Sequence, residues 1–175
     1  MTQLNDNTPV FCTAEIPDAL LNAFFREAYA APGLADEGID DVGVLINTTD
    51  PSTITHPTKV PVPPQPSFPF TGKTPEEIWA FAQQHVNPPI FNRALAILDA
   101  TTVEDGRTCL LVTTWENPPA AAGPGRDGNG NGEQLLLKAR AEFRFALEIL
   151  NVKNLGIGGD EHFRAGAEGI VRGGE

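Results

Sequence analysis

The sequence predicts a single α/β domain, spanning residues 1–175, with a central mixed β-sheet flanked by helices. Three observations predict it. Short apolar runs suited to strands alternate with segments whose apolar residues recur at helical spacing. The length of 175 residues suits one domain better than two. An apolar content of 41% is ordinary for a packed core, and no internal repeat is present.

Residues 8–14 form the first predicted strand, in which Pro9 fits at the start or at an edge. A helix follows, opened by Pro17 and ending near residues 31–33, with one apolar face that includes Phe24 and Phe25. Residues 41–47 form the second predicted strand. Its middle is continuously apolar, which is typical of a strand buried on both faces.

Residues 50–72 form a long proline-rich loop. Eight of the 16 prolines lie between Pro51 and Pro75, so neither a helix nor an interior strand is expected there. A loop of this length in a compact domain indicates either mobility or function. Phe68 and Phe70 could anchor the end of the loop to the body, or they could cover a binding cavity.

Thr74, Pro75 and Glu77 predict the start of the next helix. Thr74 can cap it, Pro75 suits the first helical position, and Glu77 can accept a hydrogen bond from the Thr74 amide. Asparagine and two prolines at 87–89 end this helix.

Residues 93–99 and 107–115 are the clearest predicted strands. The Asp105-Gly106 pair between them predicts a turn, so we expect the two strands to be adjacent and antiparallel. Residues 116–133 are rich in Gly, Pro and Asn and predict a flexible insertion.

Three elements close the predicted domain. Residues 134–139 suggest a short edge strand, and residues 140–152 a helix. Asp160 can cap a last short helix. The residues predicted to form the core are Val10, Phe11, Leu21, Phe24, Phe25, Val44, Leu45, Ile46, Ile78, Phe81, Leu95, Ile97, Leu110, Val112, Phe143, Leu147 and Leu150.

The net charge of −11 disfavours nucleic acid and anionic membranes as partners. Residues 1–50 carry nine acids and one base, which predicts a solvated face or, alternatively, a surface for a basic partner. Residues 1–9 do not resemble a signal peptide, so a cytoplasmic location is expected. Cys12 and Cys109 lie inside strand-like runs and suggest buried thiols, although a disulfide is possible if those strands are neighbours.

Motifs for cofactors and metals are weak. Gly72-Lys73-Thr74 lacks the earlier glycine of a phosphate-binding loop, because Ser67 stands there. The glycines at 156–159 come too late in the chain for a dinucleotide fingerprint. His56, His85 and His162 show no metal-ligand spacing. We therefore expect neither a cofactor nor a metal.

Four polar residues are candidates for catalysis. Glu15 and Asp99 each follow a predicted strand, and ligands of open α/β sheets gather at the carboxyl ends of strands. His162 and Arg172 would add a base and a guanidinium if the C-terminal segment converges on the same place, giving proton transfer without a cofactor. The alternative interpretation is structural: Glu15 caps a helix, Asp99 binds turn amides and Arg172 pairs with an acid.

Several of these runs resemble an uncharacterised family of bacterial and fungal domains. They are residues 13–15, residues 97–99 with Thr101 and 105–106, residues 154–157, and residues 169–173. The family usually has Asp where this chain has Glu15, and its tail usually reads Gly-Val-Phe-Arg-Gly, where Val171 replaces the Phe here. The resemblance implies a single domain that includes the C-terminal segment, and it implies no activity.

Two functions remain as hypotheses. The first is a small cofactor-independent enzyme or binder of a small organic molecule, with isomerase-, cyclase- or lyase-type acid–base chemistry. The second is a non-catalytic protein-interaction module that uses an acidic surface. A deep apolar cavity with titratable groups would favour the first. The sequence does not indicate the oligomeric state.

Overall fold

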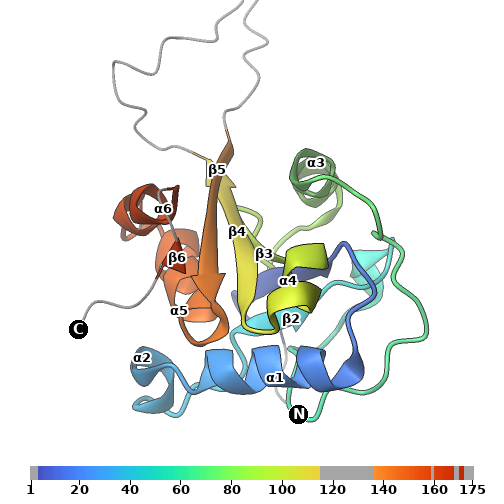
Figure 1. Cartoon of the computed structure of the whole chain (residues 1–175), viewed down its shortest axis with the longest axis horizontal. Coiled ribbons are helices and arrows are strands. Elements are labelled where there is room, and N and C mark those ends of the chain that lie inside the picture. Colours follow the sequence, from blue (N-terminus) through green and yellow to red (C-terminus); the bar gives the residue numbers. More distant parts are fainter. Residues whose placement is uncertain (1–3, 115–135, 159, 168–169, 172–175) are drawn as a thin grey trace, which may run out of the picture.

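A mixed β-sheet forms the centre of the structure (Figure 1). The computed structural model describes residues 4–114, 136–158, 160–167 and 170–171. In these ranges a mixed sheet of five strands is extended by the two-residue β6, and helices pack on the sheet, which confirms the predicted α/β fold. The strands are β1 (Thr8–Cys12), β2 (Gly43–Leu45), β3 (Ala94–Leu98), β4 (Thr108–Thr114), β5 (Leu136–Glu142) and β6 (Ile170–Val171). Across the sheet they lie in the order β2-β1-β3-β4-β5-β6.

β1 pairs in parallel with both β2 and β3, whereas β4 is antiparallel to its neighbours β3 and β5. The predicted antiparallel pair, β3 and β4, is thus confirmed. Strands β1, β2, β3 and β5 all end at one end of the sheet, which we call the carboxyl end, and β4 begins there. The opposite end, where β3 begins at Ala94 and β4 finishes at Thr114, is called the amino end.

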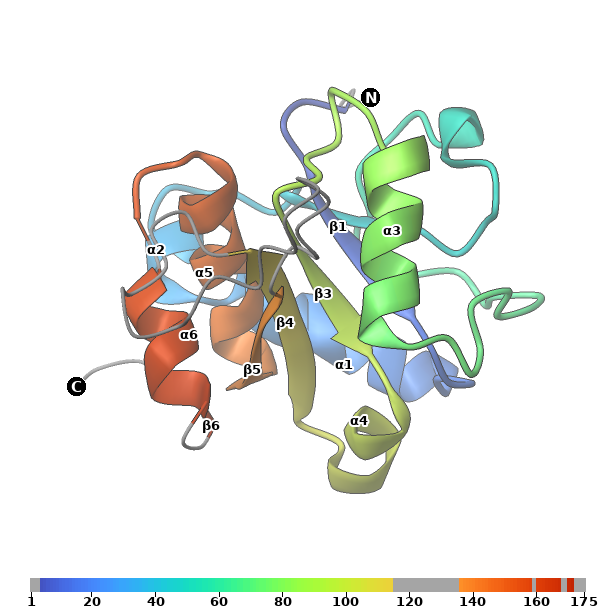
Figure 2. The ribbon, with the colours of Figure 1, turned by 90° about the horizontal axis from the view of Figure 1, so that it is seen from above.

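Helices cover both faces of the sheet (Figure 2). One face carries the helices α1 (Asp18–Tyr29) and α5 (Phe143–Asn154), and the Phe24 ring makes edge contacts with Phe25 and Phe143 at 5.0 and 5.3 Å between centroids. The other face carries α3 (Pro75–His85). Along β1 the side chains alternate between the two cores, with Val10 and Cys12 toward α1 and Phe11 toward α3.

Two helix starts agree with the sequence. Thr74 and Glu77 form the predicted capping box: the Glu77 amide donates to Thr74 Oγ1 at 3.2 Å, and the Thr74 amide donates to Glu77 Oε2 at 2.8 Å. α1 begins at Asp18, directly after Pro17. α5 also occupies the predicted region, and α6 (Asp160–Ala167) starts where a last helix was expected.

Other elements differ from the prediction. A helix, α4 (Ala100–Asp105), fills the connection between β3 and β4, and Gly106 ends it with a φ of +67°. β5 has seven residues and is not the edge of the sheet, because β6 pairs with it. β2 is instead the outermost strand on the other side, and Leu45 is only half-buried there. The short helices α2 (Pro32–Ala35) and the 3-10 turn Pro51–Thr53 were not predicted.

The proline-rich loop lies along β2 and α1 and is fixed by hydrogen bonds. The Asn22 side chain accepts from the Val62 amide at 2.7 Å and donates to the Val62 carbonyl at 3.2 Å. The Thr58 amide donates to the Gly43 carbonyl at 2.9 Å, and Thr58 Oγ1 accepts from the Leu45 amide at 2.7 Å. These bonds tie the middle of the loop to the body at two places.

Phe68 and Phe70 anchor the end of the loop on opposite faces of the sheet. Phe68 packs partly buried on the α1 side, and Phe70 is buried on the α3 side. The loop therefore passes around the carboxyl end of the sheet between these two residues.

The predicted core is largely confirmed. All its members are buried except Leu45, Phe81 and Leu110, which are partly buried against it. Cys12 and Cys109 are buried free thiols. Cys12 pairs with Leu98, which in turn lies beside Cys109 on β4, so one strand separates the two thiols and a disulfide cannot span it.

The predicted insertion at 116–133 falls outside the described residues. Within the described ranges, none of the helices combines the length and the apolar character needed to traverse a lipid bilayer.

Candidate functional site

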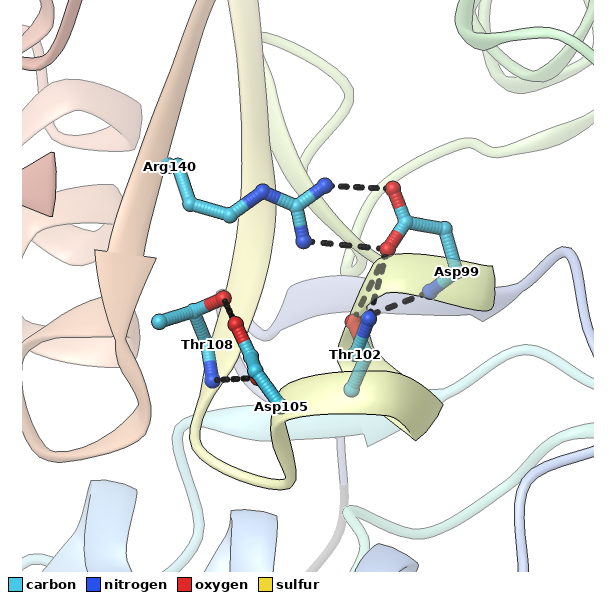
Figure 3. A network of polar contacts seen from close by, with 5 residues as sticks. All are labelled: Asp99, Thr102, Asp105, Thr108 and Arg140. Carbon is cyan, nitrogen blue, oxygen red and sulfur yellow. Dashed lines mark hydrogen bonds and ion pairs between the residues drawn. The ribbon is translucent and has the colours of Figure 1, made fainter. Parts of the chain in front are cut away.

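Asp99 lies at the carboxyl end of β3 and caps α4. Its Oδ1 accepts hydrogen bonds from the Thr102 amide at 3.0 Å and from Thr102 Oγ1 at 3.1 Å. Arg140, on β5, donates from Nη1 to Asp99 Oδ1 at 3.0 Å and from Nη2 to Asp99 Oδ2 at 2.5 Å (Figure 3). Asp99 is thus held by its own helix and by a strand two positions away in the sheet.

Asp105 is the centre of a second group of polar contacts, which lies beside the contacts of Asp99 (Figure 3). Its Oδ1 accepts from the amides of Arg107 and Thr108, both at 2.9 Å, and its Oδ2 accepts from the Thr108 hydroxyl. These bonds shape the end of α4 and the start of β4.

The pKa values of both carboxyl groups lie below the ordinary range. Burial alone would raise the pKa of Asp99, but the hydrogen bonds and charge of Arg140 and the bonds from Thr102 outweigh it. Burial opposes the shift at Asp105 too, and there the Thr108 hydroxyl, the two amides and the Arg140 charge lower the pKa. Both groups are ionised near neutral pH.

This network favours a structural role for Asp99. A general base must accept a proton from substrate, whereas each Asp99 oxygen already accepts from Arg140 and the pKa is lowered. Asp99 binds the Thr102 amide in the turn that follows, as the structural interpretation expects, and the catalytic interpretation stays a prediction.

Among the residues that the structure describes, neither Glu15 nor His162 takes part in the network of Asp99 and Arg140. Glu15 lies at the same end of the sheet, since the Thr13 amide donates to the Leu98 carbonyl at 2.9 Å, but Glu15 is exposed. His162 lies in the first turn of α6, two residues after Asp160, whose partner Lys153 lines a hollow at the amino end. Arg172 falls outside the described residues.

A hollow of about 390 Å³ lies instead between α3 and the end of the proline-rich loop. Its apolar walls come from Phe70 and Phe81, whose ring centroids are 4.9 Å apart at 65°, with Ile78 buried between α3 and the sheet. Phe11 supports both rings from β1, at 5.3 Å from Phe70 and 6.1 Å from Phe81. The hollow thus has an aromatic base that is continuous with the core.

Polar groups surround this aromatic base. The His85 ring lies 4.7 Å from Phe81, tilted by 35°. Lys73 Nζ is 3.3 Å from Glu77 Oε1, and both are half-exposed in the lining, where Thr49 and Gln84 also contribute. The Thr74 amide and Lys73 lower the pKa of Glu77, so this carboxylate stays ionised at the rim.

The sequence contains part of the signal for this hollow. Phe81 and His85 are four residues apart on one predicted helix, so their rings lie on the same face. Phe70 was recognised only as an anchor or cover. The contact of Phe70 with α3 could not be predicted, because no local spacing in the sequence indicates it.

In the part of the chain that the structure describes, no group of three or more His, Cys, Asp or Glu side chains is arranged to hold a metal ion. The fold and the hollow together define the class of protein: an α/β domain of three layers with a surface cavity that has an aromatic base and a polar rim.

No family model, no curated protein and no solved structure matches the chain with significant similarity. The resemblance to the uncharacterised domain family therefore stays a prediction.

Proposed function

We propose that the protein binds a small, largely apolar organic molecule with a flat ring in the hollow between α3 and the proline-rich loop. The observation that carries this proposal is an aromatic cluster in the cavity wall: the partly exposed Phe81 and the buried Phe70 line the cavity, and Phe11 packs against both from β1. Aromatic rings favour edge-to-face and offset contacts with a further ring, so such a ligand would extend the cluster.

The dimensions of the hollow support a small ligand. Its volume of about 390 Å³ lies within the range of small-molecule sites, about 300–1,000 Å³. Such sites usually combine an apolar base with a few polar groups that orient the ligand. Here Lys73, His85 and Gln84 supply those groups.

The cavity wall is fixed by contacts within the protein. Phe70 is only 4% exposed, its carbonyl accepts from the Lys73 amide at 3.0 Å, and the Gly72 amide donates to the Thr13 carbonyl at 3.0 Å. A preformed wall lowers the ordering cost of binding.

Turnover of the ligand is the second part of the proposal. His85 is the imidazole in the lining and would act as the acid–base group of an isomerase-, cyclase- or lyase-type reaction without a cofactor. Asp99 does not line this hollow, so its substitution would leave such a reaction intact.

Indole titration tests the binding proposal. We expect calorimetry or saturation-transfer NMR to give a Kd of about 1 mM or tighter, equivalent to about 4 kcal/mol. Ala80 is exposed and lines the hollow, so Ala80→Trp fills the cavity with a new indole and should abolish binding. Ala35→Trp, at an exposed position of α2, is the matched control and should bind indole like the wild type.

Equal binding by the two tryptophan variants, or no binding by the wild type across indole, naphthalene and benzamide, would contradict the proposal. His85→Gln separates binding from turnover: retained affinity with lost turnover supports a catalytic imidazole, whereas unchanged turnover removes that role.

The alternative function is a non-catalytic interaction module with an acidic surface. Asp36, Glu37 and Asp40 are exposed on the segment between α2 and β2, and Asp41 follows them. Lys59 Nζ lies 2.9 Å from Asp40 Oδ1, so one of these carboxylates is already paired within the chain and the exposed Asp36 and Glu37 would bind the partner. Capture of a lysine-rich peptide that weakens steeply with salt and fails in Asp36→Asn/Glu37→Gln would favour this function.

A further inference from the structure

A second hollow, of about 230 Å³, lies where α3 ends, and we call it the aliphatic hollow. The hollow between α3 and the proline-rich loop is called the aromatic hollow. His85 belongs to the lining of both. The chain also passes from one to the other, since Thr49 lines the aromatic hollow and Pro51 the aliphatic one. In Figure 2 the 3-10 turn that begins at Pro51 lies beside the end of α3. The two hollows thus adjoin at His85.

The lining of the aliphatic hollow differs in chemistry from that of its neighbour. Its apolar residues are Leu4, Pro51, Ile54, Pro88, Pro89 and Ile90. The lining residues that the structure describes include no Phe, Tyr or Trp and no Asp, Glu, Lys or Arg. A neutral, branched aliphatic group would therefore suit this hollow, whereas a flat ring suits the aromatic one.

Hydrogen bonds within the protein fix the walls of the aliphatic hollow. The Asn7 amide donates to the Pro89 carbonyl at 3.1 Å, and the Phe91 amide donates to the Asn7 carbonyl at 2.8 Å. In the 3-10 turn, Asp50 Oδ1 accepts from the Ser52 amide at 3.2 Å and from Ser52 Oγ at 2.5 Å. Walls that are fixed in this way lower the ordering cost of binding.

Two uncharged polar groups stand where the hollows adjoin. The His85 side chain is exposed, so it does not close one hollow against the other as a buried partition would. Asn87 is also exposed and lines the aliphatic hollow, and its Nδ2 lies 3.5 Å from the His85 carbonyl oxygen. A neutral imidazole and a carboxamide each offer a donor and an acceptor. An amide group of a ligand has the same combination and no charge.

We propose that the ligand has two parts, a flat ring in the aromatic hollow and a short branched acyl group in the aliphatic hollow, joined by an amide beside His85. This inference rests on the proposed function, because the ring must bind first. The aliphatic hollow of about 230 Å³ is smaller than most small-molecule sites, about 300–1,000 Å³, so it suits one part of a ligand.

Titration of the full chain with matched pairs of indole amides tests the inference. The members of a pair share ring and linker, and end in an acetyl or an isobutyryl group; the linker length varies between pairs. For at least one linker length we expect the isobutyryl compound to have a Kd about tenfold lower than that of the acetyl compound, because its additional carbon atoms leave water for the aliphatic hollow. Calorimetry measures both values.

Tryptophan substitutions in the 3-10 turn locate the acyl group. Ser52 is exposed and lines the aliphatic hollow, so Ser52→Trp fills it and should make the two Kd values equal. Thr53, the next exposed residue of the same turn, lines neither hollow, so Thr53→Trp should keep the difference of about tenfold. The NMR spectrum of each unliganded variant reports whether it is folded. Should Ser52→Trp not fold, Asn87→Trp takes its place.

The outcomes separate this inference from the proposed function. If indole binds the wild type but the acetyl and isobutyryl compounds have equal Kd values at every linker length, the two-part ligand is wrong and the aromatic hollow remains a binding site. The same conclusion follows if Ser52→Trp and Thr53→Trp keep the same difference. If indole itself does not bind, the proposed function fails, and the two-part ligand fails with it.

Discussion

Asp99 and Arg140 are joined by two hydrogen bonds, of 3.0 and 2.5 Å, although β4 lies between the strands that carry them. Arg140 stands opposite Leu110 in the pairing of β5 with β4, and Leu110 stands opposite Ile97 on β3. The Arg140 side chain therefore reaches across β4 to the first residue after β3. This contact fixes α4 relative to the far side of the sheet.

Asp99→Asn should lower the free energy of unfolding by about 2 kcal/mol. Asparagine can still cap α4, so the loss reports the ion pair and the Arg140 guanidinium left without its carboxylate. Denaturant unfolding measures it. In the double variant with Arg140→Met the two losses should not add. A change below about 0.5 kcal/mol in Asp99→Asn would show that solvent screens the pair.

Acid should destabilise the wild type through Asp99 and Asp105. Their pKa values are lowered in the folded state, so the unfolded chain takes up protons first as the pH falls below about 4. Their contribution to stability is thus complete above that pH and is lost as the pH falls through the folded pKa values. Unfolding followed between pH 6 and pH 3 should show a shallower loss in Asp99→Asn than in the wild type.

Gly156→Ala and Gly38→Ala form a matched pair. Their φ angles are +72° and +68°, and a Cβ at Gly38 would contact nothing within 4 Å, whereas one at Gly156 would meet Arg93. Each variant should lose about 1 kcal/mol of stability from backbone strain. Only at Gly156 must the added methyl group also displace a neighbouring side chain, the Arg93 guanidinium. Denaturant unfolding measures both losses, and equal losses would show that the guanidinium moves aside without cost.

Cys12 and Cys109 should not react with a thiol reagent such as dithiobis-nitrobenzoate in the native protein. Burial raises the pKa of Cys12 to about 12 and also raises that of Cys109, so little thiolate forms near neutral pH. In denaturant both thiols should react. Rapid labelling of either cysteine under native conditions would mean that the core around β1 or β4 opens locally.

Local patterns explain why much of the fold could be predicted. The capping box at Thr74 depends on residues three positions apart, and the apolar runs of β1, β3 and β4 are long enough to identify strands. α4 was missed because a six-residue helix has little periodicity, and its cap at Asp99 was interpreted as a turn. β6 has two residues, too few to form a pattern.

The sites were harder to predict because they depend on distant contacts. The rule that ligands gather at the carboxyl ends of strands directed attention to Asp99, and nothing in the sequence shows that Arg140, 41 residues later, binds its carboxylate. Phe70 precedes α3, whereas Phe81 lies within it. Arg93 and Lys153 are 60 positions apart in the sequence. Only the folded chain brings each pair into one cavity.

Thr58 has a consequence for the behaviour of the protein at high concentration. The outer side of β2 would otherwise offer unpaired backbone groups to a strand from another molecule, which is a common start of aggregation. Because Thr58 bonds to Gly43 and Leu45, and the prolines around it cannot donate from their nitrogens, that side of the sheet is closed to such growth.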